Sequence, residues 1–195
     1  MISERDFLQN KENVLEKLDE AKKRDLVDQK IIPIVELLNN VDSFYTTSSC
    51  AGRIVLLVLP EIGDKKNAEM LSKWHRTIGL EELKSALGSS DKKGQIWLIA
   101  QSPIFHVACK TLDDADRLLK ICVDSGFKHS GLKSISKKII VEILSTERLD
   151  FPIGNDDSLF CDDRHLDFLI DASNEVINRS DDKIMRLQKA LKKKI

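Results

Sequence analysis

The pattern of apolar and polar positions is clearest between residues 43 and 59. β-Branched, aromatic and hydroxyl-bearing residues come first and suit an extended segment. Ile54 to Leu59 then forms a run of six apolar residues, typical of a strand buried on both faces. Between them lies a polar turn, Ser48 to Arg53, in which Gly52 supplies conformational freedom. The pattern predicts a hairpin, and the hydroxyl, thiol and guanidinium groups of its turn indicate a functional site.

The rest of the pattern predicts helices and strands in alternation. Apolar residues at helical spacing, with Ser3 as an N-cap and Gly126 as a stop signal, predict helices over residues 3–23, 33–40, 81–87, 112–125, 156–178 and 181–194. Short apolar runs predict strands over residues 95–100, 104–110, 127–135 and 138–144, while residues 68–76 suit either a strand or a helix. The predicted class is α/β (mixed α+β) with a mixed sheet, built as one domain over residues 1–195 with a basic helical segment at 156–195.

Two segments of the chain resemble each other. Residues 41–44 precede the predicted hairpin, residues 123–127 precede the pair of strands near the C-terminal half, and both contain Val-Asp-Ser followed by Phe. Each segment leads through a serine-containing turn to a basic residue and an aliphatic strand. This similarity predicts an internal duplication of a helix–strand–strand unit. The two polar turns, at Ser48-Ser49 and Ser130-Gly131, would then meet across one cleft.

Composition excludes several classes of protein. With 195 residues, 42% hydrophobic and 32% charged, the chain is long enough and mixed enough for a globular core. No apolar run approaches the roughly 18 residues that a membrane span needs. The four cysteines are widely spaced and form no C-x-x-C pair, which favours reduced thiols and a cytoplasmic protein.

Charge is segregated along the chain although the formal net charge is only −1. Residues 125–141 carry four lysines and one histidine without an acid, and residues 183–195 carry six basic residues without an acid. Such a distribution indicates a surface that binds phosphate or RNA. A solvated helix face explains the second group equally well. For the first group, which includes Lys128 and Lys133, both interpretations stay open.

Motifs for common cofactors are missing from the sequence. The histidines and cysteines lack the spacing of metal ligands, so no metal is expected. No two of the eight glycines lie within four residues of each other, which excludes the Rossmann fingerprint, and the sequence contains no Walker loop. Cys50 would need a neighbouring base to act as a nucleophile. Its other interpretation is a small, partly buried residue in a turn.

Three further features carry chemistry. Lys73-Trp74-His75 places an aromatic ring beside cations, an arrangement that holds single-stranded RNA. Trp97 lies in an apolar run, and we predict that it belongs to the core. Glu142 interrupts an apolar strand and needs a partner, for which Arg53 and Arg148 are the candidates. A structural ion pair and a ligand-binding acid remain equally open for Glu142.

Taken in order, several motifs closely resemble the tRNA wybutosine-synthesising protein 3 family. The resemblance covers about residues 6–152 and rests on Thr46-Thr47-Ser48-Ser49-Cys50-Ala51-Gly52-Arg53-Ile54, Lys73-Trp74-His75, Phe105-His106-Val107-Ala108-Cys109, Leu112-Asp113-Asp114-Ala115, Asp124-Ser125-Gly126-Phe127-Lys128-His129-Ser130-Gly131-Leu132 and Glu147-Arg148. The serine-rich turn and the Gly-Phe-x-x-Ser-Gly block are its most specific parts.

This resemblance implies an S-adenosylmethionine-dependent methyltransferase of archaeal type. Members of the family methylate N4 of a tricyclic wyosine-type guanosine next to the anticodon of tRNA(Phe). The implied fold is an unusual α/β arrangement, in agreement with the missing Rossmann glycines. The implied partners are the modified tRNA and the methyl donor.

The resemblance and the residue chemistry together suggest roles for individual side chains. We expect the methyl donor on the two polar turns, at Ser48, Ser49, Gly52, Arg53, Ser130 and Gly131. We expect the tRNA on Lys73, Trp74, Lys128 and Lys133, with Trp74 stacked on the tricyclic base. His75 or His106 would accept the proton lost from the acceptor nitrogen, because imidazole titrates near neutral pH.

Two hypotheses from other classes compete with a methyltransferase. A non-catalytic RNA-binding module that uses the lysines of residues 128–138 predicts salt-dependent tRNA binding without affinity for S-adenosylmethionine. A small-molecule hydrolase that uses Cys50 predicts inactivation by a thiol alkylator and indifference to RNA.

Overall fold

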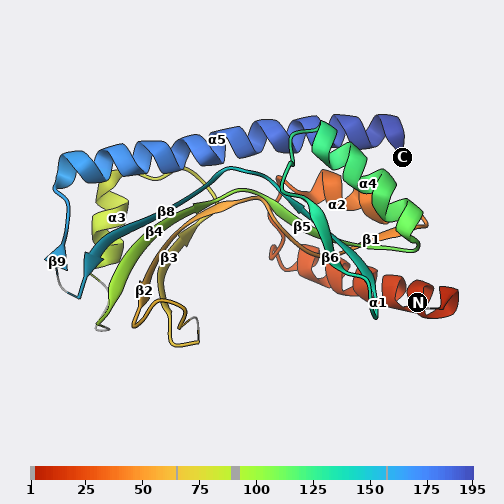
Figure 1. Cartoon of the computed structure of the whole chain (residues 1–195), viewed down its shortest axis with the longest axis horizontal. Coiled ribbons are helices and arrows are strands. Elements are labelled where there is room, and N and C mark those ends of the chain that lie inside the picture. The colour runs from red at the N-terminus through yellow and green to blue at the C-terminus, as the bar shows by residue number, and fades with distance from the viewer. Residues whose placement is uncertain (1–2, 65, 89–92, 157) are drawn as a thin grey trace. The chain divides into compact units, whose positions relative to one another are not determined.

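The computed structural model describes residues 3–64, 66–88, 93–156 and 158–195. Over these residues the chain forms five helices and nine strands, arranged in two compact units (Figure 1). The first unit comprises Met1–Ala51, Pro103–Thr146 and Asp181–Ile195. The second unit comprises Gly52–Ser102 and Glu147–Ser180. Whether the chain behaves as one domain stays a prediction.

The first unit is built on a four-stranded antiparallel sheet in the order β1-β5-β7-β6. Its strands are β1 (Phe44–Cys50), β5 (Ile104–Cys109), β7 (Ile139–Leu144) and β6 (Gly131–Ser134). Its helices are α1 (Glu4–Lys23), α2 (Ile32–Asn39), α4 (Leu112–Asp124) and the C-terminal part of α5 (Asp163–Lys194).

One face of this sheet forms the main core of the first unit. Alternate strand residues such as Phe44, Val107 and Val141 are fully buried there against α2, α4 and α5. On the opposite face α1 packs against β1, and the rings of Phe7 and Tyr45 lie 5.0 Å apart between centroids. That face also carries the polar residues described below.

Local signals account for the helices. The Ser3 side chain accepts a hydrogen bond from the Asp6 backbone N–H, and α1 ends on Lys22 and Lys23. Both features stabilise a helix, because they satisfy free N–H groups and complement the helix dipole. In α4, Thr111 and Asp114 form a reciprocal capping box. The predicted helices over 3–23, 33–40, 81–87 and 112–125 are therefore confirmed within one or two residues.

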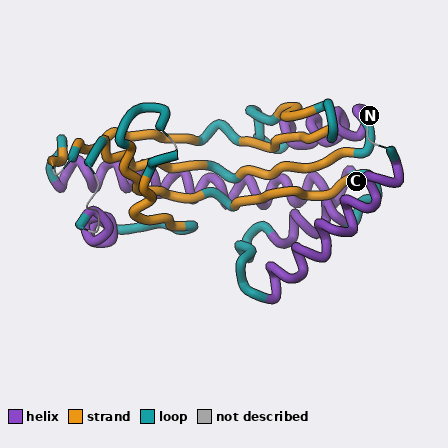
Figure 2. Tube along the Cα trace, turned by 90° about the horizontal axis from the view of Figure 1, so that it is seen from below, coloured by secondary structure: helices purple, strands orange, loops and turns teal. Residues whose placement is uncertain are grey.

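The second unit is built on a five-stranded antiparallel sheet in the order β3-β2-β4-β8-β9. Its strands are β3 (Glu69–Trp74), β2 (Arg53–Leu59), β4 (Gln95–Gln101), β8 (Arg148–Asn155) and β9 (Ser158–Leu159). One face packs on α3 (Leu80–Leu87) and on the first half of α5, with Ile54, Leu98 and Ile170 in its core. In Figure 2 the strands of this unit are seen from the face that does not carry α5.

The predicted hairpin is wrong. Both strands exist, but β1 pairs with β5 in the first sheet, whereas β2 pairs with β3 and β4 in the second. Gly52 lies between them with a φ of 97°, and Ser48 and Ser49 belong to β1 rather than to a turn. In the second proposed repeat the two strands, β6 and β7, pair with each other, whereas β1 and β2 of the first repeat do not. The two helix–strand–strand repeats are therefore not equivalent in structure.

Three other predictions need correction. The chain has two antiparallel sheets in place of one mixed sheet. The two predicted closing helices are the single helix α5, in which the Ser180 hydroxyl donates to the carbonyl of Val176 and no Gly or Pro interrupts the turns. The strands β8 and β9 were not predicted, because Pro152 and Gly154 obscure their pattern. Among the described residues, no helix is long and apolar enough to cross a membrane.

Candidate active site

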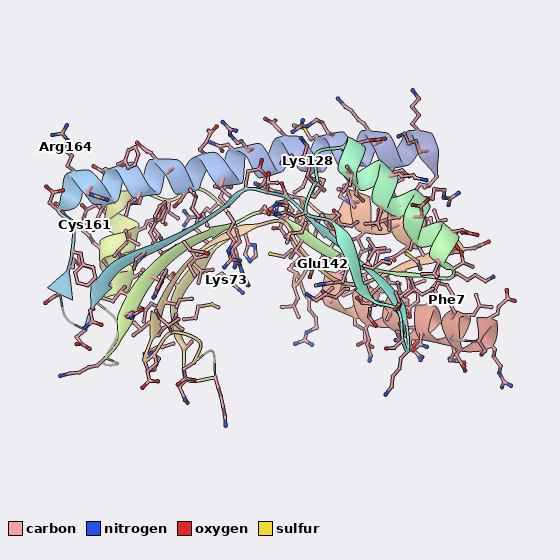
Figure 3. The ribbon with its side chains drawn as sticks, in the orientation of Figure 1. Phe7, Lys73, Lys128, Glu142, Cys161 and Arg164 are labelled. Carbon is pink, nitrogen blue, oxygen red and sulfur yellow. The ribbon has the colours of Figure 1, made fainter. Side chains whose placement is uncertain are left out.

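Three polar side chains from neighbouring strands meet on the face of the first sheet that lies opposite its main core. Ser48 is the cross-strand partner of His106, and His106 is the partner of Glu142. The Ser48 Oγ lies 2.7 Å from His106 Nδ1, and His106 Nε2 lies 2.7 Å from Glu142 Oε2. Figure 3 labels Glu142 on β7. We call this set the Ser48–His106–Glu142 row.

Strand alternation explains why these side chains share a face. His106 lies between Phe105 and Val107, which are fully buried in the core, so its ring must point to the opposite side. Glu142 lies between buried neighbours in the same way. On β1 the register shifts between Thr46 and Ser48, and this bulge brings Ser48 opposite the imidazole. The row is thus fixed by the packing of the core beneath it.

The electrostatics of the row fix which atoms hold protons. Partial burial raises the pKa of the Glu142 carboxyl. Hydrogen bonds from His106 and Lys133 outweigh this effect and bring the pKa below its ordinary value. Lys133 Nζ lies 3.1 Å from Glu142 Oε2. An ionised Glu142 can only accept, so the proton in this contact lies on His106 Nε2, while Nδ1 faces the Ser48 hydroxyl. Hydroxyl, imidazole and carboxylate in this order make an arrangement that can take up a proton.

A pocket of about 280 Å³ adjoins the row within the first unit. Its walls come from α1, from the turn after α1, from the start of α2 and from β1; they comprise Val14, Lys17, Leu18, Leu26, Val27, Asp28, Ile31, Val35, Thr46, Thr47, Ser48 and Ser49. We call it the α1–β1 pocket. The Ser49 Oγ is buried and has no hydrogen-bond partner among the described residues. Ser48 belongs both to the pocket lining and to the row.

The second unit presents polar and aromatic groups on the sheet face that its helices leave open. Arg53 Nε donates to Gln101 Oε1 at 2.9 Å, and Lys73 is exposed on the adjacent edge strand β3 (Figure 3). Trp97 is half-buried on this face and belongs to none of the core clusters, so its predicted core position is wrong. Trp74, by contrast, packs against the core of the second unit. His75 Nδ1 lies 3.0 Å from the Gly52 carbonyl oxygen.

Comparison with known proteins shows the family of this chain. Residues 9–193 match the family described as Methyltransferase TYW3. The chain belongs to this family. It is 42% identical over 188 residues, 96% of this chain and 94% of the relative, to the Thermococcus kodakarensis protein named tRNA(Phe) 7-((3-amino-3-carboxypropyl)-4-demethylwyosine(37)-N(4))-methyltransferase 1. A Methanocaldococcus jannaschii methyltransferase of nearly the same name is 42% identical over 182 residues.

A solved structure supports the fold of this TYW3 family member. The PH1069 protein of Pyrococcus horikoshii superimposes with a TM-score of 0.90 at 40% identity, covering 96% of this chain and 97% of that one. The resemblance drawn from the sequence motifs is therefore confirmed. The non-Rossmann α/β fold that it implied is confirmed as well.

The structure distributes the predicted site residues of this TYW3 family member over both units. Within the first unit it brings together Ser48, His106, Gly131 and Lys133, since Gly131 is the cross-strand partner of Glu142. Ser49 lines the adjoining pocket. The Ser130 Oγ accepts from the Leu144 backbone N–H, which gives this hydroxyl a structural role. The remaining predicted site residue of the first unit is Lys128, which is exposed.

The other predicted residues belong to the second unit. These are Gly52, Arg53, Lys73, Trp74 and His75. Their roles, like those of the first group, stay predictions. Among the described residues no cluster of three or more histidines, cysteines or acids is placed to hold a metal ion.

Sequence reasoning missed the true partner of Glu142 and the charged lining of the pocket. Glu142 pairs with His106 and Lys133, not with Arg53 or Arg148. A signal was present, because His106 and Glu142 both interrupt apolar strands and such residues need partners. For Lys17 and Asp28 the sequence offers no comparable signal, since both lie in ordinary polar surroundings in the chain.

Proposed function

We propose that this chain transfers a methyl group from S-adenosylmethionine to N4 of a wyosine-type guanosine next to the anticodon of tRNA(Phe). The observation that carries the proposal is the 42% identity over 188 residues to a relative named for this reaction. S-Adenosylmethionine supplies, when bound, a sulfonium methyl group that a nitrogen lone pair attacks. A cytoplasmic setting agrees with a tRNA substrate and with free cysteines throughout the described chain.

The Ser48–His106–Glu142 row supports a role for His106 as the base. N4 loses its proton when it gains the methyl group, so a group nearby must accept that proton. His106 can do so through Nδ1, either directly or by way of the exposed Ser48 hydroxyl, whose Oγ lies 2.7 Å from Nδ1. The imidazolium formed in this way faces the Glu142 carboxylate, which stabilises its charge.

His75 is the other candidate base, and its Nδ1 lies 3.0 Å from the Gly52 carbonyl oxygen. We assign the base to His106 because its ring lies between a carboxylate and a hydroxyl. A carboxylate stabilises the protonated imidazole that the reaction would form.

For the tRNA we propose contacts to basic and aromatic groups, named here for each unit by itself. Lys73 and Trp97 lie on the open face of the second sheet, and Lys133 lies beside Glu142 in the first unit. Lysines neutralise phosphates, and an exposed indole stacks on an unpaired base. We propose Trp97 for the stacking role that the sequence suggested for Trp74, because Trp74 packs against the core cluster on the other face of the sheet.

A methylation assay tests the proposal. Purified protein is incubated with methyl-labelled S-adenosylmethionine and with tRNA(Phe) carrying the 4-demethyl intermediate, and the label in the tRNA is counted. We expect turnover by the wild type and a loss of about a hundredfold or more in His106→Ala. His165→Ala removes an exposed histidine of α5 and serves as the matched control. Binding of tRNA without methylation under any condition would instead favour a non-catalytic RNA-binding module.

A further inference from the structure

The α1–β1 pocket has the lining of a nucleoside site. Its volume of about 280 Å³ suits part of a small molecule rather than a whole cofactor. Aliphatic side chains, among them Leu18, Val27 and Ile31, supply apolar walls against which a flat heterocycle packs. The polar wall comes from β1, whose consecutive residues Thr46 to Ser49 line the pocket.

Asp28 adds a carboxylate to this wall. Its Oδ1 accepts a hydrogen bond from the Lys30 backbone N–H, so the turn itself holds the side chain in place. A carboxylate accepts both hydroxyls of a ribose, and this is how acidic residues in many nucleotide sites recognise the sugar. The apolar walls and the carboxylate, which accepts from hydroxyls, therefore favour an adenosine group.

The Ser49 hydroxyl is a second, independent indication of a ligand. Its Oγ is buried without a hydrogen-bond partner among the described residues, and a buried unpaired hydroxyl costs stability. Rotation about one bond turns a serine hydroxyl from one direction to another. A ribose hydroxyl in the pocket is a partner of the right kind.

The position of the pocket matters for methyl transfer. Ser48 lines the pocket, and its Oγ lies 2.7 Å from His106 Nδ1 in the row. Transfer requires the donor and the group that deprotonates the acceptor to lie next to each other. A donor whose nucleoside lies in the α1–β1 pocket meets this requirement within the first unit.

We propose that the α1–β1 pocket binds the adenosine part of the methyl donor, with Asp28 on the ribose and Ser49 as a further contact. This inference rests on the proposed function, because it takes S-adenosylmethionine as the donor. It adds Asp28, and the apolar walls from α1 and the following turn, to the residues that the sequence indicated.

Calorimetric titration with S-adenosylhomocysteine, the unreactive product of the donor, tests the pocket without a turnover assay. Asp28→Asn keeps an acceptor for Lys30 but removes the charge, and we expect its affinity to fall about tenfold or more. Asp25→Asn is the matched control, because Asp25 is exposed in the same turn, does not line the pocket, and has a φ of 51°, which asparagine tolerates. The control should bind like the wild type.

Ser49→Ala separates binding from folding. We expect its melting temperature without ligand to equal or exceed that of the wild type, since an unpaired buried hydroxyl is removed, while its affinity for S-adenosylhomocysteine falls. Adenosine alone should compete for the site and methionine alone should not. Competition by methionine only would overturn the assignment of the nucleoside.

The outcomes distinguish the inference from the proposed function. If Asp28→Asn and Ser49→Ala bind S-adenosylhomocysteine as well as the wild type does, the pocket is not the donor site, while methylation by the wild type still supports the proposed function. If the wild type binds neither S-adenosylhomocysteine nor S-adenosylmethionine, with or without tRNA, the pocket assignment is wrong, and the methylation assay decides the proposed function separately.

Discussion

His106 Nε2 lies 2.7 Å from Glu142 Oε2, and the two residues face each other as direct cross-strand partners on β5 and β7. Their side chains are only 23% and 20% exposed, so the pair is partly shielded from water. Shielding strengthens the interaction between the ring and the carboxylate. The pair is therefore a means of orienting the imidazole and of stabilising its protonated form.

We expect Glu142→Gln to lower the kcat of methylation at least about tenfold with little change in KM for tRNA, because Glu142 acts through His106. Glutamine retains the shape of the side chain but loses the charge that stabilises the imidazolium. Steady-state kinetics with the 4-demethyl tRNA substrate measure both constants, and Glu12→Gln, an exposed change on α1, is the control. An unchanged kcat would remove Glu142 from the mechanism.

The same carboxylate makes stability depend on pH. Its folded pKa is lowered, so its contribution is present above the unfolded pKa of about 4.3 and is lost as the pH falls through the folded value. The difference in free energy of unfolding between the wild type and Glu142→Gln should therefore be larger at pH 6 than at pH 3. Urea denaturation at the two values measures it. A difference that is constant or grows toward low pH would contradict the assigned ionisation.

The two tryptophans should respond in opposite ways. Trp97→Ala removes a half-buried ring from the open face of the second sheet, so we expect tRNA affinity to fall by about 1–3 kcal/mol with little loss of stability. Trp74→Ala removes a partly buried ring that packs against the core cluster of the second unit, so we expect a loss of about 2 kcal/mol in free energy of unfolding. Filter binding and thermal denaturation of both variants provide the comparison. Equal tRNA affinity in Trp97→Ala and the wild type would exclude the stacking role.

Lys183 is a buried cation with a structural role in the first unit. It is 8% exposed, and its Nζ donates to the Gly126 carbonyl at 3.0 Å and to the Ser145 Oγ at 2.7 Å. Lys183→Met keeps the aliphatic stem and deprives both acceptors of this donor, so we expect a loss of about 2 kcal/mol in stability. Lys189→Met changes an exposed lysine on the same helix and should be neutral. Chemical denaturation of the three proteins tests this.

The sequence by itself determined the helices and the positions of most strands. A capping serine at Ser3, the capping box at Thr111 and the spacing of apolar residues act over a few positions, and they are visible in any short window of the chain. The motifs that carry the family resemblance are equally local. Even so, local signals failed between residues 178 and 181, where Ser180 satisfies its hydroxyl inside a continuous helix.

Only the tertiary structure decided which strands pair. Strands β1 and β2 are neighbours in the chain, but each finds its partners far away, in β5 for one and in β4 for the other. An apolar run predicts that a strand is buried, but it does not predict which strand it pairs with, because pairing depends on long-range contacts. The same long-range pairing brings Ser48 to His106 across 58 positions of the chain, and His106 to Glu142 across 36. The sequence therefore supplied the chemical groups of the site, and the sheet brought them together.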